Sequence, residues 1–309
     1  MGRGDLTDAE WERLRQFLPV SNGRRGRWRD HRQVIDGILH RVRTGVQWRD
    51  LPERFGPWKT VYERHRLWSA DGTWERLLQQ VQAAADAAGE IDWDVAVDST
   101  IVRAHQHAAG SHRPAAGPRV KGGRSGRTPG RDAVAEPARP AGGGGAGGEG
   151  LGRSRGGLTS KLHLSADGCC RPLSLLVTGG QRADCTQFEA VLEKIRVPRI
   201  GPGRPRTTPD SLAADKAHSN GPCRQYLHRR GIRHTIPEKT DSQAARRLNG
   251  SRGGRPPGFD DERYKKRNTV ERAINRLKQA RAVATRYDKR GYVFLGTATV
   301  AALVIWLRT

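Results

Sequence analysis

The segment YKKRNTVERAINRLK, residues 264–278, decides how the rest of the chain can be interpreted. On an α-helix, which turns by about 100° per residue, Arg267, Glu271 and Lys278 lie within roughly 60° of Tyr264 and share one narrow stripe with it. The next face carries apolar residues that can pack on a core, namely Val270, Ile274 and Leu277. A helix that presents one carboxylate among several cations is suited to face a metal ion and a polyanion.

Two aspartates lie upstream, where strands are expected to end. Residues 91–101, IDWDVAVDSTI, alternate apolar side chains and predict a strand that ends at Asp98. A second, short strand is predicted at Ser211–Ala214, and Asp215 follows it directly. In a right-handed arrangement these two strands can be parallel neighbours. We therefore expect both carboxylates at one edge of a sheet, with the Glu271 helix packed over that edge.

The other patterns around these strands predict a sheet with helices on both faces. Ala166-Asp167-Gly168 is typical of a turn, and the runs on either side of it, 158–165 and 172–178, predict a hairpin. The remaining expected elements are a helix at 186–195, a helix capped by Ser219 or Asn220 and ending at Arg230, a strand at 232–237, a basic loop-rich segment at 240–263 and a buried helix at 292–307. This order favours an α/β fold with a mixed sheet.

Residues 5–88 carry helical patterns only. Thr7 and Glu10 have the spacing of a capping box. Two short predicted helices, 48–55 and 58–68, flank Gly56-Pro57 and have the size of a helix-turn-helix. The cations expected to bind DNA are Arg24, Arg25, Arg27 and Arg29 in a basic connector, and Lys59, Arg64 and Arg66 on the second helix. The alternative is an ordinary helical bundle whose charges are solvated.

These patterns predict two domains, a helical DNA-binding domain at 1–90 and a catalytic domain at 91–309. The second is interrupted at about 108–157 by a segment of Gly, Pro, Ala and Arg that has almost no large apolar residue. Such a segment cannot bury enough surface to offset its ordering entropy, so we expect a disordered insert.

The composition points to nucleic acid as the partner. The net charge is +24, and 46 of the 56 basic residues are Arg, whose forked guanidinium suits phosphate and guanine. The bias toward Arg, Ala and Gly also fits a GC-rich bacterial genome. The first residues contain no apolar stretch, so no signal peptide is expected, and no stretch is expected to span a bilayer. The four cysteines lack C-x-x-C spacing, so reduced cytosolic thiols are expected.

Three carboxylates at one point can hold two divalent ions. Mg²⁺ (or Mn²⁺) takes hard oxygen ligands and keeps several waters, so few carboxylates suffice. Two ions about 4 Å apart activate the attacking oxygen and stabilise the leaving oxygen of a phosphoryl displacement. The stripe cations Arg267 and Lys278 would then meet the DNA backbone beside the cut, and Tyr264 would stack on a base or bind a phosphate. An Arg267–Glu271 salt bridge and a solvated Lys278 are the alternatives.

Several of these segments together resemble the DDE transposases of bacterial insertion sequences, closest to the insertion sequence five group. The resemblance is carried by VDSTIVRAHQHAAG (97–110), GRSRGGLTSKLHLSADG (152–168), ADKAHSN (214–220), RRGIRHTIP (229–237), GSRGGRPPGFD (250–260) and YKKRNTVERAINRLKQARAVATRYDKR (264–290). It implies a ribonuclease H-like catalytic domain, with Asp98, Asp215 and Glu271 as its metal-binding triad. It also implies that the N-terminal helices bind transposon ends. Residue 218 is His where these relatives usually have Tyr.

The function expected from the sequence is Mg²⁺-dependent cleavage and strand transfer of double-stranded DNA, at terminal inverted repeats and target sites. Such an enzyme would work as a homodimer or larger assembly when ends are paired, in the bacterial cytoplasm near the nucleoid and away from membranes. Two alternatives remain: a non-catalytic DNA-binding protein, either a regulator or an inactive transposase copy, and a two-metal nuclease without strand transfer.

Overall fold

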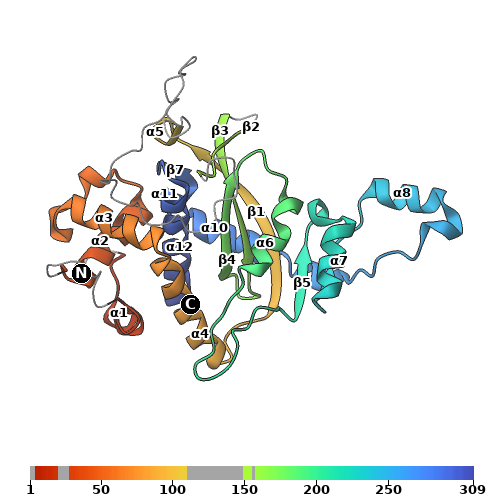
Figure 1. Cartoon of the computed structure of the whole chain (residues 1–309), viewed down its shortest axis with the longest axis horizontal. Helices are drawn as coiled ribbons and strands as arrows, with labels where there is room; N and C mark the ends of the chain where they lie inside the picture. The colour runs from red at the N-terminus through yellow and green to blue at the C-terminus, as the bar shows by residue number, and fades with distance from the viewer. Residues whose placement is uncertain (1–3, 20–27, 110–148, 155–156) are drawn as a thin grey trace, which may run out of the picture.

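A computed structural model describes residues 4–19, 28–109, 149–154 and 157–309 of the chain (Figure 1). Its centre is one mixed sheet, in which neighbouring strands follow the order β4-β3-β1-β5-β6. The strands are β1 Asp94–Ala104, β2 Gly152–Ser154, β3 Gly157–Ala166, β4 Pro172–Gly179, β5 Ser211–Ala214, β6 Arg233–Thr235 and β7 Thr285–Arg286. β3 runs antiparallel to β1 and β4, whereas β5 and β6 run parallel to β1. This is the strand order of a ribonuclease H-like sheet, so the predicted fold class is confirmed.

Helices cover both faces of the sheet, as the chain order predicted (Figure 1). On one side lie α10 Asn268–Lys278, α11 Arg281–Ala284 and α12 Gly291–Leu307, and on the other lie α6 Phe188–Glu193 and α7 Gly221–Arg229. Short 3-10 turns precede two of these helices, η4 at Asp184–Gln187 and η5 at Lys216–His218. The side chain of Asn220 accepts a hydrogen bond from the Cys223 N–H and caps α7, as expected.

The N-terminal segment is helical, with one difference from the prediction. It contains α1 Asp8–Arg15, α2 His31–Thr44, α3 Trp58–Ala70 and α4 Thr73–Ala87. Thr7 and Glu10 form the predicted capping box. Residues 48–55 form two 3-10 turns, η1 Trp48–Asp50 and η2 Glu53–Phe55, and not the α-helix that we expected. Pro52 separates the two turns and has no N–H to continue a helical ladder.

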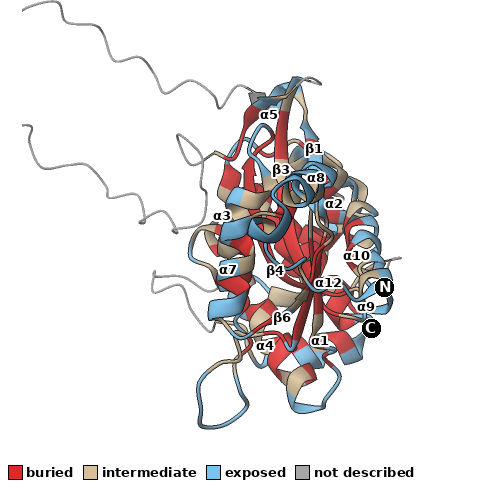
Figure 2. Cartoon of the chain, turned by 90° about the vertical axis from the view of Figure 1, so that its right-hand side faces the viewer, coloured by how far each residue is buried: buried red, intermediate tan, exposed pale blue. Residues whose placement is uncertain are grey.

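α12 joins the N-terminal helices to the sheet. It is buried along nearly its whole length and lies between α2, α3 and α4 on one side and β4 on the other (Figure 1). One continuous cluster of buried apolar side chains therefore runs from the N-terminal helices into the sheet (Figure 2). The division into domains at residue 90 stays a prediction. No described helix, α12 included, is long and apolar enough to cross a membrane.

A chain of buried polar groups crosses the same contact. Trp74 Nε1 donates to His65 Nδ1 (3.1 Å), and His65 Nε2 lies 3.2 Å from Thr297 Oγ1 on α12. Thr297 donates to Asp288, which also pairs with Arg41 of α2 at 3.1 Å. Each of these groups partners the next, although Nε and Nη1 of Arg41 are buried without a hydrogen-bond partner.

Both ends of the predicted insert contain regular secondary structure. Residues Gln106–Ala109 form the short helix α5, and β2 pairs with β3. Arg286, which is fully buried, donates to the carbonyl oxygen of Gly150 and holds this end of the segment on the sheet. These ends are ordered because they reach buried partners that composition does not reveal. Residues 110–148, the bulk of the predicted insert, lie outside the described part of the chain.

Candidate active site

The two aspartates lie side by side on neighbouring parallel strands. β5 pairs with β1 only as far as Val97 opposite Ala214, so Asp98 and Asp215 are the next residues in register. Our prediction that the β1 strand ends at Asp98 was wrong, because pairing with β3 carries β1 on to Ala104. What ends here is the pairing with β5. Asp98 thus stands at a notch in the sheet, between the end of the β5 pairing and the β7 pairing that begins at Arg103.

The electrostatics of Asp98 reflect this position. Burial raises the pKa of its carboxyl group, and the negative charge of Asp215 raises it further. The Ser99 N–H and the positive charge of Arg267 act in the opposite direction without outweighing those two effects. A carboxylate that is partly desolvated beside a second carboxylate gains most from a nearby cation.

Asp215 is held by the turn that follows it. Its carboxylate accepts hydrogen bonds from the Ala217 N–H (3.0 Å) and from His218 Nδ1 (2.8 Å). Burial opposes ionisation of Asp215, but the hydrogen bond and charge of His218, together with the Ala217 N–H and the charge of Arg267, outweigh it, so the pKa of Asp215 is lowered. The His218 ring is buried against Phe188, at 5.1 Å between ring centroids. In the sequence His218 stands out only as a departure from relatives, whereas in the structure its hydrogen bond orients Asp215.

The 264–278 segment is not one helix. Tyr264 lies on α9, Asp261–Lys265, and α10 starts at Asn268 after a tight turn through Lys266 and Arg267. The N–H of Arg267 and that of Val270 both bond three residues back, which winds the backbone more tightly than an α-helix. The prediction of a single stripe from Tyr264 to Lys278 was therefore wrong at its N-terminal end. The apolar face of α10 is buried as expected, at Val270, Ile274 and Leu277.

Arg267 bridges two of the three predicted carboxylates. Its Nη1 lies 3.3 Å from Asp98 Oδ2, and its Nη2 bonds to Glu271 Oε1 one turn further along α10. The salt bridge to Glu271 that we weighed as an alternative is present, and it coexists with a contact to the β1 aspartate. The guanidinium thus occupies the space between Asp98 and Glu271.

Two further stripe residues reach the same region. Lys278 Nζ donates to the carbonyl oxygen of Ile101, three residues beyond Asp98 on β1 (3.3 Å), and burial lowers the pKa of this amine. Tyr264 faces Arg267, whose guanidinium carbon lies 5.8 Å from the ring centroid. Both ends of α10 are therefore tied to β1 through cations. Lys278 is half-buried, so the alternative of a fully solvated lysine is not what the structure shows.

A second polar cluster was missed by the sequence analysis. Asp184 accepts a hydrogen bond from Ser99 Oγ at 2.6 Å and pairs with Lys161 at 3.0 Å. His163 Nδ1 lies 3.7 Å from the same carboxylate, but burial lowers the pKa of His163 to about 4, so this contact is not an ion pair near neutral pH. Because Ser99 directly follows Asp98, the cluster fixes the β1 backbone at the candidate site. These residues lie on different strands and turns, so no local pattern linked them.

The oxygen donors fit a hard divalent cation only in part. Within the described residues, no group of three or more His, Cys, Asp or Glu lies close enough to hold a metal ion. Asp98 and Asp215 supply adjacent carboxylates of the kind that Mg²⁺ prefers. Glu271 is turned toward Arg267. The predicted triad is therefore brought to one region, with a guanidinium placed among its members.

The predicted DNA-binding cations have different surroundings. Arg29, Lys59 and Arg66 are exposed, and Arg66 pairs with Glu63 at 3.0 Å. The predicted residues Arg24, Arg25 and Arg27 lie outside the described part of the chain.

Among these cations, Arg64 does not have the exposed position that we predicted. It is buried, and its guanidinium carbon stacks 3.9 Å from the centroid of the Trp28 ring. Its Nη1 lies 3.0 Å from His31 Nδ1. This arginine packs inside the helical layer, so it is not placed to read bases.

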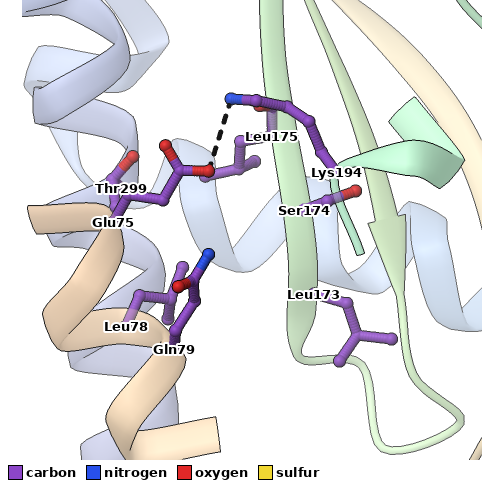
Figure 3. Close-up of a pocket in the computed structure, with 8 residues that line it drawn as sticks. All are labelled: Glu75, Leu78, Gln79, Leu173, Ser174, Leu175, Lys194 and Thr299. Carbon is purple, nitrogen blue, oxygen red and sulfur yellow. Dashed lines mark hydrogen bonds and ion pairs between the residues drawn. The ribbon is translucent and has the colours of Figure 1, made fainter. Parts of the chain in front are cut away.

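A hollow between α4, α12 and β4 is part of a structural contact. It is lined by Glu75, Leu78, Gln79, Leu173, Ser174, Leu175, Lys194 and Thr299 (Figure 3). Figure 3 shows Glu75 and Lys194 pointing toward each other, and their ion pair spans 3.6 Å. The charged groups satisfy one another, and no predicted site residue lines the hollow.

Comparisons with known families cover most of the chain. Residues 90–306 match the family described as "Transposase DDE domain". Residues 6–78 match the family described as "Putative transposase of IS4/5 family".

Individual relatives match shorter parts of the chain. The uncharacterised protein y4sN of Sinorhizobium fredii is 42% identical over 38% of this chain and 87% of its own length. An uncharacterised 16.2 kDa protein of insertion element IS402 from Burkholderia cepacia is 37% identical over 34% of this chain and 76% of its own. The "Putative transposase for insertion sequence element IS6501" of Brucella ovis is 28% identical over 49% of this chain and 100% of its own.

One solved structure aligns along the chain. The crystal structure of a pre-cleavage Mos1 transpososome covers 96% of this chain and 84% of its own, at 11% identity. The TM-score of 0.22 is too low to indicate a shared arrangement.

Proposed function

The chain belongs to the DDE transposase family, and we propose that Asp98, Asp215 and Glu271 form its metal-binding triad for cutting and joining DNA strands. The observation that carries this proposal is the register of β1 and β5, which sets Asp98 beside Asp215 at a notch in the sheet. The α10 helix packs against β1 and β3 and brings Glu271 to the same region.

The family uses divalent metal ions, and the donors here suit Mg²⁺ or Mn²⁺. When bound by these carboxylates, two such ions would activate an attacking oxygen and neutralise the leaving oxygen of a phosphodiester.

The chain's own part in that chemistry is to supply the carboxylates, with Asp98 and Asp215 held by the backbone of two paired strands. Arg267 must move away from Asp98 for the triad to close around a cation.

The cations around the triad would place the DNA. Arg267 and Lys278 lie at the two ends of α10, and both reach β1 beside Asp98. Guanidinium and ammonium groups in these positions suit the phosphates on either side of a cut. His218 would keep Asp215 ionised and correctly turned, because its hydrogen bond is made to the charged carboxylate.

We further propose that the substrate is double-stranded DNA at the terminal inverted repeats of an element and at its target. The exposed cations Arg29, Lys59 and Arg66 support a DNA surface on the N-terminal helices. Pairing two ends in one reaction would require a homodimer or a larger assembly. This substrate would place the protein on the bacterial nucleoid, in the cytoplasm.

The test uses the full chain and the DNA that flanks its reading frame on both sides. With Mg²⁺, wild-type protein should nick or cut these flanks and join a supplied 3′ end to a second duplex, whereas Asp98→Asn should bind the same DNA without cutting it. Cutting without joining would favour a nuclease. Binding by wild-type protein without any cutting would favour a regulator or an inactive copy.

A further inference from the structure

A basic arm projects from the body of the protein between β6 and the α9–α10 segment. It consists of α8 Thr240–Leu248, the 3-10 turn η6 Gly250–Gly253 and the extended residues 254–258 (Figure 1). No residue of α8 is buried, and Figure 2 shows the helix standing in front of the molecule. A helix without a buried face is not there to complete a core.

The arm nevertheless has a defined shape. Arg246 donates to both carboxylate oxygens of Glu238, at 2.9 and 3.3 Å, and fixes α8 to the chain that enters it. η6 folds back on the end of α8 so closely that a Cβ added at Gly253 would lie 2.1 Å from the Arg246 carbonyl oxygen. Gly254 then takes a φ of +74°, which favours glycine and redirects the chain.

Basic residues outnumber acidic residues in the arm. Residues 239–258 contain five basic side chains and one acidic side chain, Asp241. Arg247, Arg252 and Arg255 are exposed and form no ion pair among the described residues. Unpaired arginines on a projecting element are suited to a polyanion outside the molecule.

The spacing of two of these arginines is suited to a narrow groove. Arg252 and Arg255 are separated by Gly253 and Gly254, so no side chain stands between them to hold the backbone away from a surface. Pro256 and Pro257 follow, and each fixes φ near −65° and favours extended chain. The minor groove of DNA is about 6 Å wide and narrower still at A/T tracts, where its negative potential attracts arginine.

The base of the arm leads to the candidate site. Phe259 contacts the ring of Tyr264, with centroids 5.2 Å apart, and Tyr264 faces Arg267. Arg267 in turn contacts Asp98. DNA held by the arm would therefore continue toward the carboxylates.

We propose that this arm inserts Arg252 and Arg255 into the minor groove of the DNA next to the cut, with a preference for A/T-rich sequence. The inference rests on the proposed function, because it takes the same DNA as ligand. It adds a contact outside both the triad and the N-terminal helices.

The test compares full-length Arg252→Ala/Arg255→Ala with a matched control, Arg196→Ala/Arg199→Ala. The control removes two exposed arginines from the segment between α6 and β5. Binding is measured without divalent metal on two 30-base-pair duplexes that differ only in an A/T or a G/C block. We expect wild type and control to bind the A/T duplex at least about tenfold more tightly. The arm variant should lose that preference, and netropsin, a minor-groove ligand, should compete with wild type and control but not with the arm variant.

Several outcomes would overturn the inference. The proposed minor-groove contact is wrong if the arm variant keeps the A/T preference or if wild-type protein shows no such preference. Either result would contradict it even if wild-type protein still cuts DNA. A wild type that binds neither duplex would instead count against the proposed function. If the arm variant changes only the oligomeric state in light scattering, the arm contacts a second copy of the chain and the inference fails.

Discussion

Trp74 Nε1 donates a hydrogen bond to His65 Nδ1, and this contact fixes the proton of His65 on its other nitrogen. An indole N–H can only donate, so His65 Nδ1 must accept. His65 Nε2 is then the donor to Thr297 Oγ1, and the Thr297 hydroxyl in turn donates to Asp288. The network has one consistent arrangement of hydrogens only while His65 is neutral.

Acid should therefore weaken the folded state through His65. Burial lowers the pKa of His65 to about 4, against an ordinary value of 6.5. The unfolded chain binds this proton first, so the contribution is complete above pH 6.5 and is lost as the pH falls toward 4. Between pH 6.5 and 5 the loss should be about 1.5 kcal/mol. Urea unfolding of wild type and His65→Asn at both pH values measures it. An equal pH dependence in the two proteins would contradict the assignment.

Asp215→Asn and Glu271→Gln should each abolish DNA cleavage and leave DNA binding largely intact. Both changes keep the side-chain shape and remove the charge that a divalent ion needs. Cleavage of labelled flanking DNA and gel-shift binding are measured side by side. Glu262→Gln, a matched change on the exposed side of α9, serves as the control and should cut normally. Normal cleavage by either triad variant would remove that residue from the site.

Replacing Arg267 should change the titration of Asp98. The positive charge of Arg267 favours the ionised form of this carboxyl group, so Arg267→Gln should raise the pKa of Asp98 further. Carboxyl carbon NMR of the metal-free protein can follow this pKa directly, with Lys266→Gln as a neighbouring control. A pKa of Asp98 that does not move would show that the 3.3 Å contact is absent in solution.

Lys278→Ala should leave folding intact and lower the strand-transfer rate at least about tenfold, which corresponds to about 1.4 kcal/mol of barrier. The reason is the position of its amine, which reaches the β1 backbone beyond Asp98. Arg272→Ala removes an exposed cation from the same helix and is the matched control. If Lys278→Ala and Arg272→Ala both match wild type in single-turnover strand transfer, the lysine has no part in placing DNA.

Arg64→Ala should destabilise the N-terminal helices rather than weaken a base contact. The guanidinium stacks on the Trp28 ring and contacts His31, and a partly buried cation–π contact is worth about 1–2 kcal/mol. Thermal unfolding should therefore shift downward for Arg64→Ala and stay unchanged for the exposed Lys59→Ala. DNA affinity at low salt should fall for Lys59→Ala. The reverse pattern would return Arg64 to the DNA surface.

The sheet could be predicted because its signals are local. Ser211–Ala214 was predicted as a short strand directly before Asp215, and Asn220 as a cap from a preference that acts within one turn. The candidate site could be predicted only in outline. A helical wheel assumes unbroken geometry, so it could not show the tight turn that separates Tyr264 from α10.

Other features depend on contacts between distant parts of the chain. Asp184 joins Ser99 across 85 residues of sequence, and Arg64 is buried by an indole from a preceding segment. Residues 240–263 were predicted as a basic, loop-rich segment, and this prediction missed the α8 helix, none of whose residues is buried.

The position of α12 has a consequence for how the protein is made. Its 17 residues are synthesised after every other described helix and strand, yet they fill the space between α2–α4 and β4. While α12 is still inside the ribosome, the apolar faces of α2–α4 and β4 that pack against it have no partner. A translation product that stops before Gly291 would leave those faces open to chaperones and proteases, so interrupted copies of the gene should yield little lasting protein.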